Sequence, residues 1–371
     1  MTIAAPNPNL TTAGVIRTLR ASGKPLHEWG RGINGAPLLA ARTGGDKGPP
    51  IFITAGSHAN ETAGIHAALN LLHVLDTEHQ VHVLPLRDPF GFGGVNHCLS
   101  FAAGQRVELP SHGAALDYLS AHGELIWREG DMHVYRLGDL GFAWTPPRPG
   151  SESLNRMHAR LLALVRDDPA ALRPLWGQSV MLLSAMADVE GTGEMGRCWH
   201  GVMSAEGEWL HLNRFFGRDD APPEVSAVER LMRTVRPGLT CDMHEGRGEG
   251  FWMPVPRPEE NPERVFDMTR AYLDYIRRRD YPITTYEEWI ATERKFNRNY
   301  TPGWISPAPR LPGLFWLDGS LRGEGHNLMD YAGLFGIGFG TEGPLVRPLD
   351  MRVDGITQGI LAAIRVWEQT L

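Results

Sequence analysis

The chain has 371 residues, of which 42% are hydrophobic and 21% are charged, and these are the values of a globular protein and not of a disordered or fibrous one. The formal net charge is −7 and basic residues do not cluster, which argues against nucleic acid or an anionic membrane as a partner. The three cysteines are too few and too widely spaced for a disulfide framework or a CxxC zinc site.

The first third of the chain has the pattern of a β-α-β unit. A strand is predicted for PPIFITAGSH, which follows a Gly/Pro turn, and a second strand for HQVHVLPLRDP. The segment between them, AGIHAALNLLHVL, has helical periodicity. Such a unit implies two parallel strands joined by a right-handed crossover.

Between Gly94 and Gly196 the pattern is looser, which indicates an insertion at about residues 99–195. Helices are predicted for SHGAALDYLSAHG and SESLNRMHARLLALVRDD, and a Pro/Gly-rich loop is predicted for LGDLGFAWTPPRPGS. Two interpretations are open: the insertion walls a pocket, or it is ordinary surface elaboration.

The second half of the chain returns to a regular pattern. Strands are predicted for GEWLHLNRFF, PGLTCDMHEG and FGIGFGTEGP. Helices are predicted for PPEVSAVERLMRTV and for the C-terminal GITQGILAAIRVWEQTL. The mixed segment from Pro254 to Gly325 has the same two interpretations as the insertion.

His58 and Glu61 stand three residues apart at the turn from the first strand into the helix, so an imidazole and a carboxylate can converge there. Two His and one Glu around an open fourth position form a known catalytic zinc set. Because sites in open α/β sheets lie beyond the carboxyl ends of the strands, His244 in TCDMHEG is the candidate for the third ligand. The alternative for the HxxE pair is a surface turn that caps the helix.

Four short motifs follow one another in the order GSHANETAG, LNRFF, CDMHEG and FGTEGP. In this order they resemble the zinc carboxypeptidase family, the carboxypeptidase A-like enzymes, and the related aspartoacylase and succinylglutamate desuccinylase group. The resemblance covers residues from about 50 to 98 and from about 195 to the end. It implies one catalytic domain over residues 1–371, an α/β fold with a central mixed, mostly parallel sheet of the eight-stranded type, and helices on both faces.

The resemblance also implies a metal and a base. It implies one Zn²⁺ per chain on His58, Glu61 and His244, although Fe, Co or Mn would suit the same donor set. Glu342, in FGTEGP, matches the catalytic carboxylate that takes a proton from water and returns it to the leaving amine. The alternative for Glu342 is a solvated carboxylate at a strand end.

Three further residues match positions that handle the substrate. Asn213 and Arg214 match an Asn-Arg pair that holds the free carboxylate of the substrate, which a guanidinium does with two parallel hydrogen bonds. Arg197 has the spacing of the arginine that stabilises the oxyanion. The alternatives are an exposed arginine at position 214 and a loop ion pair at position 197.

The chain departs from the family pattern around these motifs. His211 stands where the family has an Asp that orients a metal-bound His, and Asp242, two residues before His244, is either its replacement or a structural residue. Arg87 and Asp88 replace residues of an expected Asn-Pro-Asp-Gly turn. Other departures concern the pocket, where Arg322 or His326 stand in place of a mobile Tyr, and where three tryptophans either form an apolar wall or cover the core: Trp252, Trp304 and Trp316.

The expected function is hydrolysis of an amide bond next to a free carboxylate, with a small peptide as substrate. The alternative is an N-acyl amino acid amidohydrolase of the aspartoacylase type, which an insertion that narrows the cleft would favour. A catalytically silent peptide-binding protein would require the loss of a ligand or of the base. The N-terminus lacks a signal-peptide pattern and no uncharged run could span a bilayer, so a cytoplasmic protein is expected.

Overall fold

The computed structural model describes the chain except for residues 1–4, 151, 259–261, 297, 299–302 and 318–326. Its main sheet has six strands in the order β1-β2-β4-β3-β11-β15. These strands are β1 (Leu26–Arg31), β2 (Pro37–Gly44), β3 (Ile51–Ala55), β4 (Gln80–Leu84), β11 (Leu239–Gly246) and β15 (Ile337–Pro344). The four strands β4, β3, β11 and β15 run parallel, and β2 and β1 extend the sheet in antiparallel fashion. The sheet is therefore mixed and mostly parallel, as expected, but within the described residues it has six strands and not eight.

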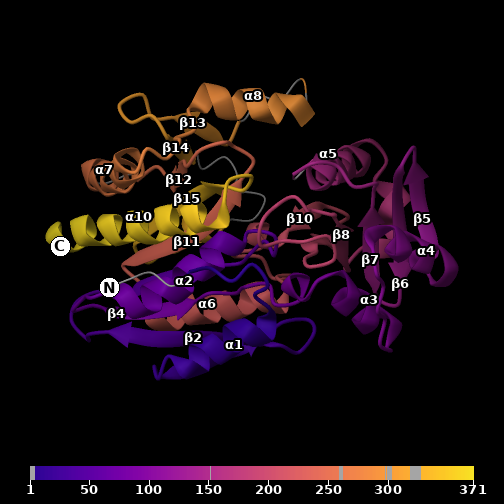
Figure 1. Ribbon diagram of the computed structural model, residues 1–371, viewed down its shortest axis with the longest axis horizontal. Coiled ribbons are helices and arrows are strands. Elements are labelled where there is room, and N and C mark those ends of the chain that lie inside the picture. The colour runs from indigo at the N-terminus through magenta and orange to yellow at the C-terminus, as the bar shows by residue number, and fades with distance from the viewer. Residues whose placement is uncertain (1–4, 151, 259–261, 297, 299–302, 318–326) are drawn as a thin grey trace.

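Helices cover both faces of the main sheet (Figure 1). One face packs against α1 (Thr12–Ala21), α2 (Thr62–Val74) and α10 (Leu349–Gln369), and α7 (Pro262–Arg278) packs in turn on α10. The other face packs against α6 (Pro223–Val235) and the short α9 (Leu328–Ala332). Because both faces are covered, β3 and β11 are buried along almost their whole length. β3 is a nearly continuous apolar run, whereas β11 carries the buried polar side chains of Asp242, His244 and Glu245.

The β-α-β unit predicted from the sequence is β3, α2 and β4, and its two strands pair in parallel. The strands predicted in the second half are also present in the main sheet, as β11 and β15. The segment GEWLHLNRFF contributes only the three-residue β10 (Trp209–His211), and this strand belongs to a different sheet.

A second six-stranded sheet, in the order β10-β9-β8-β7-β6-β5, contains most of the predicted insertion and continues beyond it. Its other strands are β5 (Glu124–Glu129), β6 (Met132–Leu137), β7 (Leu140–Trp144), β8 (Ser179–Leu183) and β9 (Trp199–Met203). One face packs against α3 (Val95–Ala103) and α4 (His112–His122), and the other against α5 (Glu152–Asp167). This sheet lies to the right of the main sheet in Figure 1.

The prediction of a loop at residues 137–151 was wrong for its first half. Leu140–Trp144 is the fully buried strand β7, which forms a hairpin with β6 through the two-residue turn Gly138-Asp139. Gly138 has a φ of 58°, the left-handed conformation that such tight hairpin turns require. The glycines in this segment therefore mark a hairpin turn, and only the prolines after Trp144 mark a loop.

The segment after β11 forms a smaller layer above the main sheet in Figure 1. It contains a three-stranded sheet of β12 (Met253–Pro256), β14 (Leu314–Leu317) and β13 (Ile305–Pro307), with α8 (Tyr286–Phe296) near it. Aromatic side chains fill the space beneath this sheet, among them Trp252, Trp289 and Phe315.

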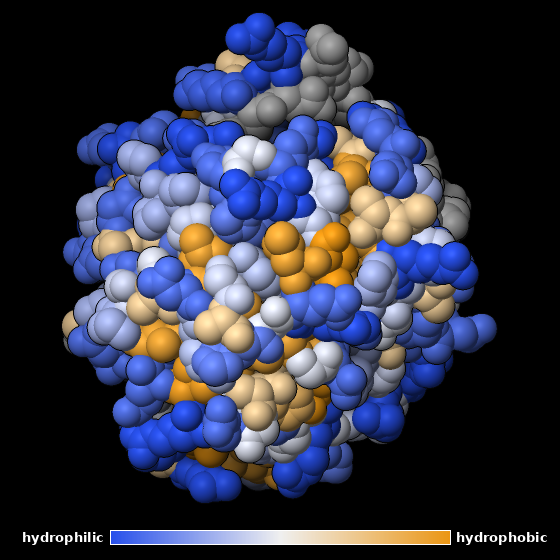
Figure 2. Space-filling view, turned by 90° about the vertical axis from the view of Figure 1, so that its right-hand side faces the viewer, coloured by the Kyte–Doolittle hydropathy of each residue, from blue (hydrophilic) through white to orange (hydrophobic). Residues whose placement is uncertain are grey.

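Figure 2 looks onto the end of the molecule that the second sheet forms. Its surface is mostly hydrophilic, and hydrophobic side chains gather there only in small groups. Small groups of this kind are normal for a protein surface. In the described part of the chain, no helix is both long enough and apolar enough to cross a membrane.

His66, in α2, gives the fold a pH dependence that can be measured. It is 8% exposed, and burial lowers its pKa from the ordinary 6.5 to about 4. As the pH falls, the unfolded chain protonates at His66 before the folded chain does. The contribution of the neutral His66 to the free energy of unfolding is therefore complete above about pH 6.5 and decreases by about 1.4 kcal/mol per pH unit between pH 6.5 and pH 4. The test measures the free energy of unfolding of wild type and of His66→Gln with urea, in the presence of a chelator. The value for wild type minus the value for the variant is expected to decrease by about 1.4 kcal/mol for each pH unit between pH 6.5 and pH 4. A difference that is constant between pH 7 and pH 4 would contradict this assignment.

Candidate metal centre

The structure brings His58, Glu61 and His244 together, with one ligand atom of each within 4.8 Å of the others. His58 Nδ1 lies 2.7 Å from Glu61 Oε1, and His244 Nδ1 lies 2.8 Å from Glu61 Oε2. His58 and Glu61 occupy the turn between β3 and α2, and His244 lies on β11, the parallel neighbour of β3. The convergence follows from the topology, since the carboxyl ends of neighbouring parallel strands meet at one edge of the sheet.

Glu61 does not cap the helix, although it occupies the N-cap position of α2. Its side chain makes no capping hydrogen bond and both of its oxygens face the two histidines. Glu245 of β11 accepts a hydrogen bond from the backbone N–H of Ala63 at 2.7 Å and serves the helix terminus instead. Arg352 of α10 forms a buried ion pair with Glu245. The alternative interpretation of the HxxE pair as a capping turn is therefore wrong.

In each of the two histidines, the ring nitrogen that does not face Glu61, Nε2, lies within hydrogen-bonding distance of another side chain. Asp242 Oδ2 lies 2.9 Å from His244 Nε2, and His211 Nδ1 lies 2.9 Å from His58 Nε2. Arg87 in turn pairs with Asp242, at 2.8 and 3.1 Å from its two carboxylate oxygens. Both imidazoles are thus oriented with Nδ1 toward Glu61, which is the arrangement that outer hydrogen bonds impose on metal-binding histidines.

The electrostatics of this network favour charged carboxylates. Burial alone would raise the pKa of Glu61, but the two histidines outweigh it and lower the pKa to about 2. Burial opposes ionisation of Asp242 as well, and Arg87 and His244 together lower its pKa to about 2. Both carboxylates therefore bear a negative charge at neutral pH, and Glu61 can offer it to a cation.

Glu342 lies directly beside the three ligand candidates. It stands on β15 in register with His244 on β11, and its side chain lines the same cavity as His58 and Glu61. Burial raises the pKa of Glu342 well above the ordinary value, against the opposing effect of His244. A carboxylate with a raised pKa is better suited to exchange protons near neutral pH.

The cavity above these residues has a volume of about 1120 Å³. Its walls come from the turn that carries His58 and Glu61 (the metal-site turn), from β10, from α8 and from the inserted helix α5. The lining residues of α5 include Asn155, His158 and Leu162. Of the three tryptophans singled out in the sequence, Trp252 and Trp304 line the cavity, whereas Trp316 is buried against Phe266 in the core. Arg322 and His326 lie outside the described residues.

The Asn-Arg pair is divided between the cavity and the network behind it. Arg214 lines the cavity. Asn213 is 3% exposed and does not line it; its amide nitrogen lies 3.2 Å from His244 Nε2, and its oxygen accepts a hydrogen bond from the backbone N–H of Leu328. The two residues belong to one 3₁₀ turn, which directs consecutive side chains to different sides. The prediction that Asn213 contacts a substrate is therefore not supported by its position.

Arg197 does not reach the cavity. Its guanidinium donates hydrogen bonds to the backbone carbonyls of Leu10, Phe92 and Gly196 and lies over the Phe92 ring at 3.7 Å from the centroid. These contacts hold the N-terminal segment against the loop that follows β4. The assignment of Arg197 to oxyanion stabilisation was wrong, because spacing along the chain did not reveal which way this side chain turns.

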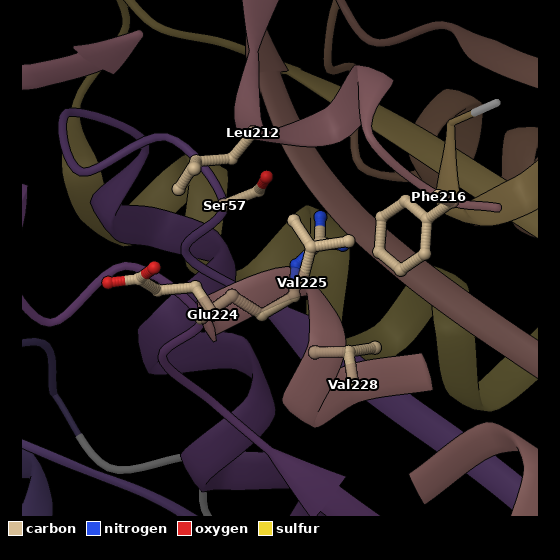
Figure 3. A pocket seen from close by; sticks show the side chains of 7 residues that line it. Ser57, Leu212, Phe216, Glu224, Val225 and Val228 are labelled. Atoms are coloured by element: carbon tan, nitrogen blue, oxygen red, sulfur yellow. The ribbon is translucent and has the colours of Figure 1, made fainter. Parts of the chain in front are cut away.

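A second cavity, of about 10 Å³, lies behind the metal-site turn (Figure 3). Phe216, Val225 and Val228 form an apolar side of it, and Ser57, Arg87 and Glu224 supply polar groups. This volume holds about one water molecule. It is therefore too small for a substrate.

The ion pair between Arg87 and Asp242 leads to a prediction on stability. Their side chains are 4% and 0% exposed, so removal of the arginine leaves the buried carboxylate of Asp242 with His244 as its remaining cationic partner. Arg87→Met is expected to lower the free energy of unfolding by about 3–5 kcal/mol, measured with urea. Arg310→Met is the matched control, because Arg310 and Glu263 are 63% and 57% exposed, and no measurable change is expected there. Equal effects of the two substitutions would contradict the prediction.

In the sequence, Arg87 and His211 stand out only as departures from the family pattern, and nothing distinguishes His158. The structure places all three in or beside the metal centre. The sequence does contain one indication of the role of His211, because it occupies the position of an Asp that orients a metal-bound histidine. A histidine side chain can form this hydrogen bond as well. No signal in the sequence pointed to His158, which reaches the cavity only because α5 lies over it.

No protein-family model matches the sequence, and no curated protein matches it. Among solved structures, the chain is similar to a metallo-carboxypeptidase from Burkholderia cenocepacia, with 12% identity over 96% of this chain and 69% of that one and a TM-score of 0.48. It is also similar to carboxypeptidase A from Helicoverpa armigera, with 10% identity over 96% and 71% of the two chains and a TM-score of 0.42. Thrombin activatable fibrinolysis inhibitor gives 10% identity over 98% and 81%, with a TM-score of 0.45. The solved structures to which the chain is similar thus include a metallo-carboxypeptidase. Because the sequence identities are only 10–12%, any conclusion about function has to rest on the residues of the site.

Proposed function

We propose that this chain is a zinc-dependent hydrolase that cleaves an amide bond next to a free carboxylate in a peptide. One observation carries the proposal. Two imidazole nitrogens and a carboxylate converge at the floor of a large cavity, and a second carboxylate, Glu342, stands in register beside them.

The donor set fits a divalent transition metal. His58, Glu61 and His244 would hold it, because nitrogen and carboxylate donors are what Zn²⁺ takes in hydrolytic sites that keep one position open. A metal bound there would make a water molecule more acidic and would polarise the carbonyl group of the substrate. One metal ion per chain is expected.

The residues of the chain supply the proton transfers and the binding of the substrate. Glu342 accepts a proton from the attacking water while the water oxygen bonds to the carbonyl carbon and the π electrons of the carbonyl move onto its oxygen. When the carbon–nitrogen bond breaks, Glu342 returns the proton to the leaving nitrogen. Arg214, in the cavity wall, would hold the free carboxylate of the substrate with parallel hydrogen bonds.

The size of the cavity favours a peptide over a small N-acyl amino acid. Its volume of about 1120 Å³ is slightly above the range of ligand pockets, which is about 300–1,000 Å³. The inserted helix α5 forms one wall of this cavity. A silent binding protein is disfavoured, since the three ligand candidates and the base are all present together.

Incubation of the zinc-loaded protein with a peptide library and with a library of N-acyl amino acids, followed by mass analysis, tests the proposal. Release of single C-terminal residues from peptides is the expected result. Cleavage of N-acyl amino acids alone would replace the peptidase assignment by the amidohydrolase one. Cleavage of neither library would refute the proposed function.

A further inference from the structure

The proposed reaction places a negative charge on the carbonyl oxygen of the substrate. The arginine that the sequence predicts for the stabilisation of this charge, Arg197, is not available for it. Arg197 lies away from the cavity and binds three backbone carbonyls. Hydrogen-bond donors aimed at such an oxygen are among the largest contributions to amide hydrolysis. Another donor in the cavity wall can supply this contribution.

His158 has the position of such a donor. It lies on the inserted helix α5 and lines the same cavity as His58, Glu61 and Glu342. Its ring lies 5.1 Å from the Trp199 ring, which in turn stacks at 5.6 Å on His58. A single tryptophan therefore separates His158 from a candidate metal ligand.

A hydrogen bond determines which nitrogen of His158 carries the proton. Trp209 Nε1 donates to His158 Nδ1 at 3.0 Å. An indole N–H can only donate, so Nδ1 must accept, and the single proton of the neutral ring is then on Nε2. Within the described part of the chain, Trp209 is the only hydrogen-bond partner of His158.

The surroundings keep His158 neutral and in place. Burial, together with Arg247 and Arg214, lowers its pKa to about 3, so the imidazole is uncharged at any working pH near neutrality. Trp209 is buried and lies on β10, which pairs with β9. A neutral imidazole fixed in one tautomer is a known electrophile in enzymes.

Two arginines that line the cavity, Arg214 and Arg247, have other contacts. Arg214 Nη1 donates to the backbone carbonyl of Asn213 at 2.8 Å and its guanidinium lies 5.9 Å from the Trp304 ring. Arg247 forms an ion pair with Glu293 at 2.9 Å. His158 differs from both because its donor is neutral and its direction is set by Trp209.

We propose that His158 is a catalytic residue of the proposed reaction: its Nε2–H donates a hydrogen bond to the oxygen of the scissile carbonyl and stabilises the charge that develops there. The inference rests on the proposed function, and it assigns a chemical task to the inserted helix. The hydrogen bond adds no atom to the substrate and leaves the proton on Nε2.

The test compares His158→Phe with His158→Gln in the zinc-loaded protein. The phenylalanine variant keeps the bulk of the ring but has no donor, and is expected to lower kcat by about 10²–10³-fold with little change in KM. The glutamine variant can accept from Trp209 with its oxygen and donate with its nitrogen, so it should recover part of the loss. Metal content and circular dichroism serve to show that both variants are folded and loaded.

Two measurements do not depend on turnover. A phosphinate peptide imitates the tetrahedral adduct. Its Kd for His158→Phe is expected to exceed its Kd for wild type by about the same factor by which kcat falls. A product amino acid is expected to bind equally well to wild type and to His158→Phe. The ¹⁵N NMR spectrum of wild type should show His158 as the Nε2–H tautomer, and Trp209→Phe should relax this preference.

The outcomes separate the two proposals. Unchanged kcat and unchanged phosphinate affinity in His158→Phe would overturn the role of His158 while the hydrolase assignment stands. A change in KM alone would also overturn it, since it would make His158 a binding residue. A wild type that cleaves no peptide and no N-acyl amino acid would refute the hydrolase assignment itself.

Discussion

Glutamine in place of Glu342 is expected to lower kcat by about 10²–10⁴-fold, because an amide cannot take a proton from water and return it to the leaving nitrogen. The substitution preserves the size of the side chain, and Glu342 is not among the three groups that would hold the metal. Metal content should therefore stay at one ion per chain. Steady-state kinetics with the best peptide substrate, together with elemental analysis of the same sample, measures both quantities.

A matched control for this prediction lies in the same cavity. Glu293 on α8 also lines the cavity, but it faces Arg247 at 2.9 Å and not the metal centre. Glu293→Gln should change kcat far less than Glu342→Gln does. Retained turnover in Glu342→Gln, or equal losses in the two variants, would refute the assignment of Glu342 as the base.

Alanine in place of either His58 or His244 is expected to remove the metal and with it the activity. Each substitution deletes one of three ligands, and the remaining imidazole and carboxylate do not make a complete site. Elemental analysis should find about one zinc ion per chain in wild type and none in either variant. Treatment of wild type with a chelator should have the same effect, and added zinc should restore activity only to wild type.

His66→Ala provides the control for the loss of a histidine as such. His66 lies on α2, the helix that follows Glu61, but its buried ring does not belong to the metal centre. This variant is expected to be less stable and still to bind one zinc ion per chain. Zinc bound at wild-type stoichiometry by both His58→Ala and His244→Ala would refute the metal site.

Parts of the fold and of the site follow from local patterns in the sequence. The sequence predicts the β3-α2-β4 unit, β11 and β15 because strands and helices differ in hydrophobic period and in length. His58 and Glu61 share one turn and His244 ends a neighbouring strand, so their convergence follows once these strands are recognised as parallel. Asp242 was placed correctly on the face of His244 because side chains alternate along a strand.

The positions that the sequence predicted wrongly lie where no such period exists. Arg197 belongs to a loop and Asn213 to a 3₁₀ turn, and in both the direction of the side chain depends on contacts with distant segments. The Pro and Gly content of residues 137–151 predicts a loop, but the glycine at position 138 belongs to the turn of the hairpin between β6 and β7.

The sequence by itself determined the β3-α2-β4 unit and the three candidate ligands, because these depend on residues that are close in sequence or on adjacent strands of one regular sheet. The mixed sheet as a whole and Glu342 as the candidate base were implied by the family resemblance. Only the tertiary structure decided which side chains complete the centre: His211 behind His58, Arg87 behind Asp242, and His158 in the cavity wall. These contacts join segments that lie far apart along the chain. Their geometry is set by how the second sheet and α5 pack against the main sheet, and no local pattern in the sequence encodes that packing.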